Sequence, residues 1–269
     1  MMSISEYQPP VSELLNYGDC RNHNEWVNYV QDLGLEHKHI PELIKMVKDP
    51  ELNQADSESK EVWSPLHAWR ALGQLKALEA FEPLVELLNE GDDEWLNEDF
   101  PIICTLIGLD TVPLLKELLS DTSKSVYARI DAASSLESIS HKYPATRDSV
   151  VEAIAGELKK FEHNDSIFNA LLISKLVDLQ AVETINLIEQ AFKTNRVENF
   201  ICGDFEDIQV DFGLKSPDEV QKSRFSEIAS LFSSSNKNKK VFKGFGFNKL
   251  ELDAKKRKSR KSSKKKKKR

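Results

Sequence analysis

The chain has 269 residues, 40% of them hydrophobic, and a formal net charge of −7, which fits one large domain or an array of repeats. It contains no run of about 18 apolar residues, so a membrane-spanning helix is excluded. Its cysteines, Cys20, Cys104 and Cys202, lie far apart, and its first residues lack a secretion signal, so we expect a cytoplasmic protein without disulfides.

Apolar residues recur at i, i+3, i+4 and i+7 over most of residues 10–193, and this period predicts amphipathic helices. The polar, acidic segment 49–61 is predicted to be a loop. In chain order, the predicted helices are Ser12–Leu15, Trp26–Val30, one at Pro41, Trp63–Leu72, one at Pro83, about Glu98–Ile107, one at Pro113, Val126–Ile139, Asp148–Phe161, Ile167–Leu176 and Val182–Phe192.

One phrase returns along the chain: the end of a helix, a short turn, then Pro-Leu and a pair of apolar residues. Residues 72–88 contain it around Pro83, and residues 106–119 contain it around Pro113. Echoes occur at Pro41 and at 176–182. Recurrence every 30 to 45 residues or so is typical of helical solenoids. We therefore predict an all-α, right-handed solenoid of about five helical hairpins over residues 10–215.

The end of the chain differs from the repeats. Residues 200–214 are short, aromatic and turn-rich, and we predict that they cap the last repeat, because a terminal repeat needs its apolar face covered. Residues 216–254 are predicted to be a flexible linker and residues 255–269 a disordered Lys/Arg tail. Residues 237–269 have a net charge of +15, which leaves −22 on residues 1–236.

Three short segments resemble HEAT repeats, and specifically the short HEAT-like repeats of phycobilisome lyases. They are Ala68–Gly73, Glu82–Leu88 and Ile107–Leu114. Over residues 10–215 the chain resembles a family of uncharacterised bacterial, often cyanobacterial, HEAT-like proteins. The resemblance implies a HEAT-like solenoid and supplies no catalytic residues. Relatives with similar repeats can end in a cysteine-rich metal-binding segment, whereas this chain has Lys and Arg there.

Two tight pairs of metal-ligand residues stand about 14 positions apart: Cys20 with His23, and His37 with His39. Such pairs can bind zinc. Surface histidines on a polar turn account for the second pair equally well, and we predict no metal and no cofactor.

Catalytic motifs are missing from the sequence. His67 has Glu58 and Glu61 nearby, but it stands at a helix start between two tryptophans with no nucleophile beside it, so we predict a packing or capping role. Cys104 lies in an apolar helix, which indicates an inert buried thiol. The chain has no Gly-rich phosphate loop, G-x-S-x-G or H-E-x-x-H. We expect a protein that is not an enzyme.

A cluster of acidic residues surrounds one tryptophan between two predicted helices. One interpretation is a solvated turn whose acids face the positive end of the next helix. The other is a protein-binding surface, in which an aromatic anchor ringed by acids suits a basic partner. The residues concerned are Asp92, Asp93, Glu94, Trp95, Glu98 and Asp99.

The tail is the second candidate binding segment, because its cations attract any polyanion. It lacks interleaved aromatics, which favours charge-dependent over sequence-dependent binding. A solubilising end and a nuclear-import signal are alternatives, and the tail can also lie on the acidic body until RNA competes for it. Its cationic residues are Lys255, Lys256, Arg257, Lys258, Arg260, Lys261, Lys264, Lys265, Lys266, Lys267, Lys268 and Arg269.

These patterns predict a non-enzymatic scaffold or adaptor, with an acidic repeat surface for a protein partner and a basic tail for RNA or the ribosome. The alternative is a lyase- or chaperone-like factor for a chromophore-binding protein, implied by the resemblance to phycobilisome lyases. We expect no stable membrane association through the tail, because the tail has neither the lipid anchor nor the amphipathic helix that stable binding requires. The sequence sets no oligomeric state.

Overall fold

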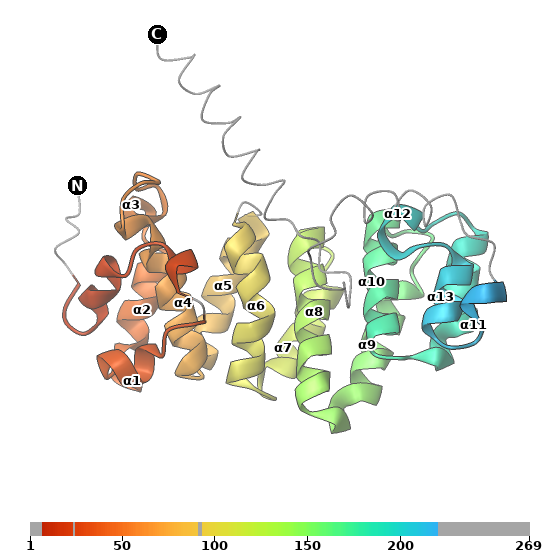
Figure 1. The fold of residues 1–269 in the computed structure, drawn as a ribbon, viewed down its shortest axis with the longest axis horizontal. Helices are drawn as coiled ribbons and strands as arrows, with labels where there is room; N and C mark the ends of the chain where they lie inside the picture. The colour runs from red at the N-terminus through yellow and green to blue at the C-terminus, as the bar shows by residue number, and fades with distance from the viewer. Residues whose placement is uncertain (1–6, 24, 91–92, 220–269) are drawn as a thin grey trace, which may run out of the picture. The chain divides into compact units, whose positions relative to one another are not determined.

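A computed structural model describes residues 7–23, 25–90 and 93–219, and every regular element within these residues is helical. Short 3₁₀ turns precede or follow several of the α-helices. The α-helices, labelled in Figure 1, are α1 (Tyr29–Leu33), α2 (Ile40–Val47), α3 (Pro50–Asn53), α4 (Ser64–Gln74), α5 (Phe81–Glu90), α6 (Glu94–Ile107), α7 (Thr111–Ser120), α8 (Val126–Lys142), α9 (Arg147–Leu158), α10 (Ser166–Asp178), α11 (Ile185–Lys193), α12 (Asn199–Cys202) and α13 (Phe205–Asp211). The prediction of an all-α fold is confirmed for these residues.

Long helices pack one against the next in chain order. Helix α4 contacts α6, α6 contacts α8, and α8 contacts α10 (Figure 1). The helices α2, α5, α7 and α9 pack in turn against α4, α6, α8 and α10. The buried apolar side chains form one cluster that runs from Tyr7 to Phe212. Neighbouring helix pairs therefore share a continuous core.

The glycine of the Leu72-Gly73 pair, at the start of the recurring phrase, has a packing role in α4. A Cβ atom placed on Gly73 would lie 3.3 Å from Cα of Ile103 in α6. This is closer than most Cβ contacts, so glycine allows the two backbones to approach. The absence of a side chain at Gly73 thus fixes the distance between α4 and α6.

The turns of the phrase share one helix-ending geometry. After α4, Lys76 has φ +55°, and the Ala77 N–H donates to Leu72 O at 3.0 Å. After α10, Gln180 has φ +51°, and the Ala181 N–H donates to Leu176 O at 2.9 Å. A left-handed residue with such a six-to-one hydrogen bond is the Schellman motif, which satisfies the last carbonyls of a helix. The two turns therefore match in structure as they match in sequence.

The structure corrects some predicted boundaries. Helix α6 begins at Glu94 and not near Glu98, because Asp93 caps its first turn. The segment predicted as a loop at 49–61 contains the short helix α3, which Asp49 caps through the N–H groups of Glu51 and Leu52. The first predicted helix is a 3₁₀ helix, Val11–Asn16. Capping residues thus begin α3 and α6 where apolar periodicity alone gives no signal.

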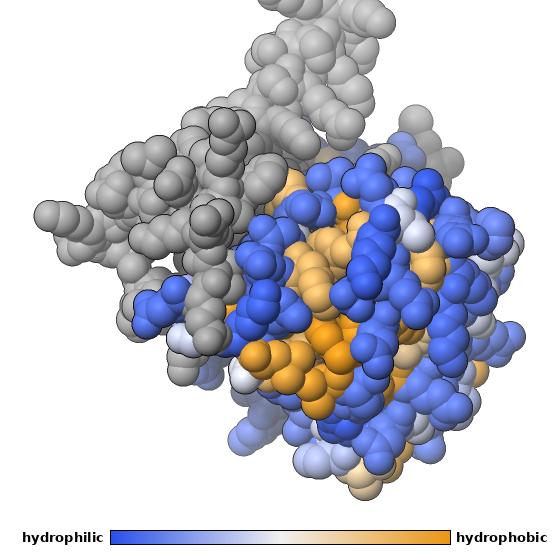
Figure 2. Space-filling model, turned by 90° about the vertical axis from the view of Figure 1, so that its right-hand side faces the viewer, coloured by the Kyte–Doolittle hydropathy of each residue, from blue (hydrophilic) through white to orange (hydrophobic). Residues whose placement is uncertain are grey.

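The predicted capping segment forms α12 and α13, which pack against α10 and α11, respectively. Phe205 lies 5.8 Å from Phe192 of α11, measured between ring centroids. Figure 2 views this side of the molecule, where apolar residues gather among hydrophilic ones. Phe200 and Leu214 remain 65% and 50% exposed. None of the helices described here has the length and apolarity needed to span a membrane.

Candidate functional site

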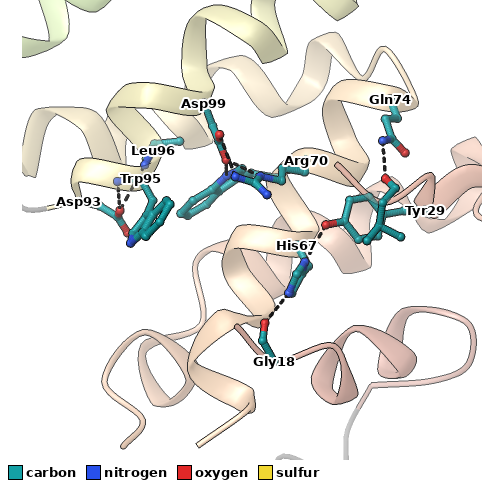
Figure 3. A network of polar contacts seen from close by, with 11 residues as sticks. Gly18, Tyr29, His67, Arg70, Gln74, Asp93, Trp95, Leu96 and Asp99 are labelled. Atoms are coloured by element: carbon teal, nitrogen blue, oxygen red, sulfur yellow. Dashed lines mark hydrogen bonds and ion pairs between the residues drawn. The ribbon is translucent and has the colours of Figure 1, made fainter. Parts of the chain in front are cut away.

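The predicted acidic surface centres on the first turns of α6. Asp93 is the N-cap, and its carboxylate accepts hydrogen bonds from the N–H groups of Trp95 and Leu96 at 2.9 and 3.2 Å (Figure 3). Trp95 is half-buried, and its ring lies 5.7 Å from that of Trp63 in an edge-to-face contact. Glu94 is half-buried and Glu98 is exposed. This geometry accommodates both interpretations, because an N-capping acid can also border a binding surface.

Asp99 does not belong to this acidic surface, contrary to the sequence prediction. Its side chain is 5% exposed and pairs with Arg70 of α4, whose Nε donates to Oδ2 at 2.6 Å and whose Nη2 donates to Oδ1 at 3.1 Å. The Trp69 indole N–H donates to the same Oδ2 at 2.8 Å. The Arg70 guanidinium also lies 4.7 Å from the ring centroid of Trp26. Asp99 therefore joins α4 to α6 and is not available to a partner.

His67 is the centre of a second buried contact set, shown in Figure 3. It is fully buried, its Nε2–H donates to Gly18 O at 2.7 Å, and its Nδ1 accepts from the Tyr29 hydroxyl at 2.6 Å. Burial lowers the pKa of His67 from 6.5 to about 4, with smaller lowering effects from Arg70 and His23 and an opposing, raising effect from the hydrogen bond to Gly18. The ring is therefore neutral near pH 7, and the predicted packing role is confirmed.

An open hollow of about 300 Å³ lies on the outer side of Gly18. Two segments form its walls: the turn that follows the first 3₁₀ helix and the loop that precedes α4. We call it the Trp63 hollow. Its lining residues are Tyr17, Gly18, Asp19, Arg21, Asn22, Ser57, Glu58, Ser59, Lys60 and Trp63. Because Trp63 also touches Trp95, the hollow adjoins the acidic surface of α6.

Arg21 and Asp19 form an ion pair at the edge of the hollow. The guanidinium donates from Nε and Nη2 to the carboxylate and lies 5.4 Å from the ring centroid of Trp63. The hydrogen bond from Arg21 lowers the pKa of Asp19, and the same bond raises the pKa of Arg21. Both groups are charged near pH 7, so their charges cancel within the pair.

Gly18 shapes the opposite wall. It has φ +69°, and a Cβ atom there would lie 3.3 Å from Cγ of Lys60. The Lys60 side-chain stem therefore packs directly over the glycine, and a side chain at position 18 would press against it. Beside it, the Ser59 Oγ is buried and has no hydrogen-bond partner. The sequence analysis did not single out Ser59 or Lys60, because both stand in a polar stretch. The only local sign of a close contact in this region was the glycine at position 18.

The remaining candidate residues do not assemble into a reactive or metal-binding group. Cys20 is buried, and desolvation raises its pKa to about 11. His39 accepts the Glu36 N–H at 2.9 Å in a capping box. No group of three or more His, Cys, Asp or Glu side chains within the described ranges could hold a metal. Cys104 is fully buried and burial raises its pKa, so the predicted burial of this thiol is confirmed.

Two other predicted sets lie outside the described residues: Asp92, and the cations of the tail from Lys255 to Arg269. The interpretation of the tail as a polyanion-binding segment remains a prediction.

Comparison with known proteins finds one family. Its model, described as protein of unknown function (DUF1186), matches residues 28–238, which is more than half of the chain. No curated protein and no solved structure gives a significant match.

Proposed function

The chain belongs to the DUF1186 family, whose description carries no activity, and we propose from its own surface that it is a non-enzymatic adaptor that binds a basic protein segment. The single observation that carries this proposal is the half-buried Trp95, set against Trp63 among acidic side chains. Aromatic anchors surrounded by charge of one sign are typical of binding surfaces for an oppositely charged partner.

The arrangement of helices supports a HEAT-like solenoid as the framework. Alternating helices pack in chain order with one shared core, and the turns at Lys76 and Gln180 repeat the same geometry. Solenoids present extended surfaces built from equivalent positions of successive repeats. In this proposal, the first turns of α6 form one part of such a surface, and the resemblance to phycobilisome-lyase repeats concerns the framework alone.

Charge supports the choice of a basic partner. Residues 1–236 have a net charge of −22, and Glu94 and Glu98 stand beside Trp95 on α6. A surface of one sign raises the association rate of an oppositely charged partner and loses that advantage as salt increases. The proposed partner is a Lys- or Arg-rich segment of a cytoplasmic protein. The tail, in the same proposal, binds RNA or the ribosome through its charge.

The test is a comparison of matched double variants in the full chain. Immobilised wild-type protein and Glu94→Gln/Glu98→Gln are incubated with nuclease-treated cell lysate, and the retained proteins are identified by mass spectrometry. The control is Glu152→Gln/Glu162→Gln, which removes the same charge from exposed positions in α9 and just after it. We expect a protein with a basic segment to be retained by the wild type and the control and lost by the first variant.

Equal retention by all three proteins would refute the acidic surface as the binding site. A second pulldown, without nuclease, compares the full chain with a chain truncated before Lys255. Salt-sensitive RNA retention should disappear with the tail, and its persistence would refute that part of the proposal. Recovery of a chromophore-binding protein at α6 would favour the lyase-like alternative, which no specific contact of the described residues favours.

A further inference from the structure

The turns that follow α4, α6, α8 and α10 share one hydrogen bond. In each turn, the N–H of the fourth residue donates to the carbonyl oxygen of the first, at 2.9 to 3.1 Å. The four bonds run from Ala80 to Ala77, from Thr111 to Gly108, from Thr146 to Tyr143 and from Thr184 to Ala181. The second residue of each of these turns is apolar and exposed. These residues are Leu78, Leu109, Pro144 and Val182, and we call them the turn row.

The turn row follows one edge of the stacked helices. Helices α4, α6, α8 and α10 are parallel, because each is joined to the next by one returning helix and short connections. They also pack side by side in chain order. Their C-terminal ends therefore share one edge, which is the lower edge in Figure 1. The row and Trp95 lie at opposite ends of α6, which are about 20 Å apart along a 14-residue helix.

The turn itself does not require an apolar residue in the row. The turn after α1 has the same hydrogen bond, at 2.9 Å, and its second residue is the exposed His37. Single exposed apolar residues are ordinary on protein surfaces, but Leu78, Leu109 and Val182 are 37%, 49% and 42% exposed at the same place in different repeats. Solenoids bind partners through extended surfaces built from such equivalent positions. The row therefore has the character of a binding surface.

The charge beside the row is negative. Glu79 and Asp110, the third residues of the first two turns, are exposed, and neither forms an ion pair with another described residue. The exposed Lys76 offsets one of these acids. Two other cations are already bound within the chain: Lys142 donates to a carbonyl oxygen at 2.9 Å, and Arg147 donates to two carbonyl oxygens and to the acid of the last turn. A cationic partner therefore complements the row, whereas a second copy of this acidic body would be repelled.

The spacing of the row selects the conformation of the partner. Packed helices stand about 8 to 10 Å apart, and one member of the row follows the end of each helix. A polyproline II helix brings every third side chain to the same side, about 9 Å apart. Neighbouring side chains on one face of a β-strand are about 7 Å apart, and those on one face of an α-helix about 5 Å. Of the three conformations, only polyproline II places consecutive same-side residues at the interval of the row.

We propose that the turn row binds a segment of another protein in the polyproline II conformation, with an apolar residue at every third position and Lys or Arg between them. The apolar side chains pack on the four members of the row, and the cations face Glu79 and Asp110. About ten residues span the row, because three intervals of about 9 Å separate its four members. This surface is separate from the acidic surface around Trp95 and does not depend on the proposed adaptor function.

The test is a peptide array probed with the full chain. One library contains peptides of about ten residues with Leu, Ile, Val or Pro at every third position and Pro, Lys or Arg elsewhere. The second library contains the same residues with the apolar ones at every second position. The tightest peptide of the first library is titrated by fluorescence polarisation. It should bind at least about 10-fold more tightly than its reordered counterpart, and its affinity should fall as salt increases.

Variants place the binding on the row. Leu78→Ser/Leu109→Ser removes two exposed apolar side chains from neighbouring turns, and we expect about a 10- to 100-fold loss of affinity. The matched control is Tyr127→Ser/Ile167→Ser. These residues are 61% and 47% exposed in the first turns of α8 and α10, at the opposite edge, so the control should bind as the wild type does.

Two further variants separate the row from the proposed adaptor surface. Glu79→Gln/Asp110→Asn should weaken peptide binding about 3- to 10-fold and reduce its dependence on salt. Glu94→Gln/Glu98→Gln should leave the affinity for the peptide unchanged. Failure of the adaptor surface and failure of the row are therefore distinguishable.

Three results would overturn the proposal: no binding or equal binding of the two libraries, unchanged affinity in Leu78→Ser/Leu109→Ser, or an equal loss in Tyr127→Ser/Ile167→Ser. Urea unfolding of each variant establishes that it is folded. If the leucine double variant is unfolded, Val182→Ser in the last turn takes its place, with an expected loss of at least about 3-fold. Unchanged affinity in Val182→Ser would then overturn the proposal.

Discussion

His67 should make the stability of the folded chain depend on pH between 7 and 5. The neutral ring donates from Nε2 to Gly18 O and accepts at Nδ1 from the Tyr29 hydroxyl. A second proton on Nδ1 would remove the acceptor for the Tyr29 hydroxyl and leave a charge in a fully buried site. Protonation should therefore favour the unfolded chain.

The size of the effect follows from the two pKa values of His67, about 4 in the folded chain and 6.5 as the ordinary value. Because the unfolded chain takes up the proton first, the stabilisation is present above pH 6.5 and is lost as the pH falls toward 4. Between pH 7 and pH 5 the loss is about 2 kcal/mol, and the full loss below pH 4 is about 3 kcal/mol.

The assay is urea unfolding of the full chain at pH 7 and pH 5, with His67→Gln as the perturbation. Glutamine can donate to Gly18 O and accept from Tyr29 without titrating, so this variant should lose most of the pH-dependent change. The control, His163→Gln, replaces an exposed histidine and should retain the wild-type change. An equal pH dependence in the wild type and in His67→Gln would refute the reasoning.

Other predictions concern the ion pair and the turns. Asp99→Asn should lower the free energy of unfolding by about 3 to 5 kcal/mol in urea titrations, because it leaves the Arg70 cation buried and unpaired; a loss below about 1 kcal/mol would contradict this. Lys76→Gly should raise it by about 1 kcal/mol, because glycine adopts φ +55° without strain. Lys159→Gly, at a right-handed helix end, should lower it by a similar amount, and the same sign for both glycine variants would contradict the turn geometry.

The repeated phrase predicts the helices well because it combines several local signals. Proline suits a first helical turn, and Pro41, Pro83 and Pro113 all stand in the first turns of α2, α5 and α7. Apolar periodicity then identifies the buried face of each helix. The similarity between the turns at Lys76 and Gln180 could also be predicted from the sequence, because each turn and its flanking leucines form one local unit.

Contacts between distant segments could not be predicted in this way. Asp99 reads as one of several acids near Trp95, and only the helical rotation of α6 turns it toward Arg70, 29 residues away. The Trp63 hollow brings residues 17–22 beside residues 57–63, and no period links these stretches. The glycine at position 18 is the only local sign of this contact. Its φ is positive, and Lys60 packs against it where a side chain would otherwise stand.

Site-specific photo-crosslinking tests the proposed adaptor function most directly. A photoreactive residue is placed at the exposed Glu98 in the full chain and, as a control, at the exposed Glu152, and each protein is irradiated in nuclease-treated lysate. The crosslinked peptides are sequenced by mass spectrometry. We predict a Lys- or Arg-rich peptide from one protein at position 98 and no such peptide at position 152. Acidic or apolar peptides at position 98, or the same peptides at both positions, would contradict the account.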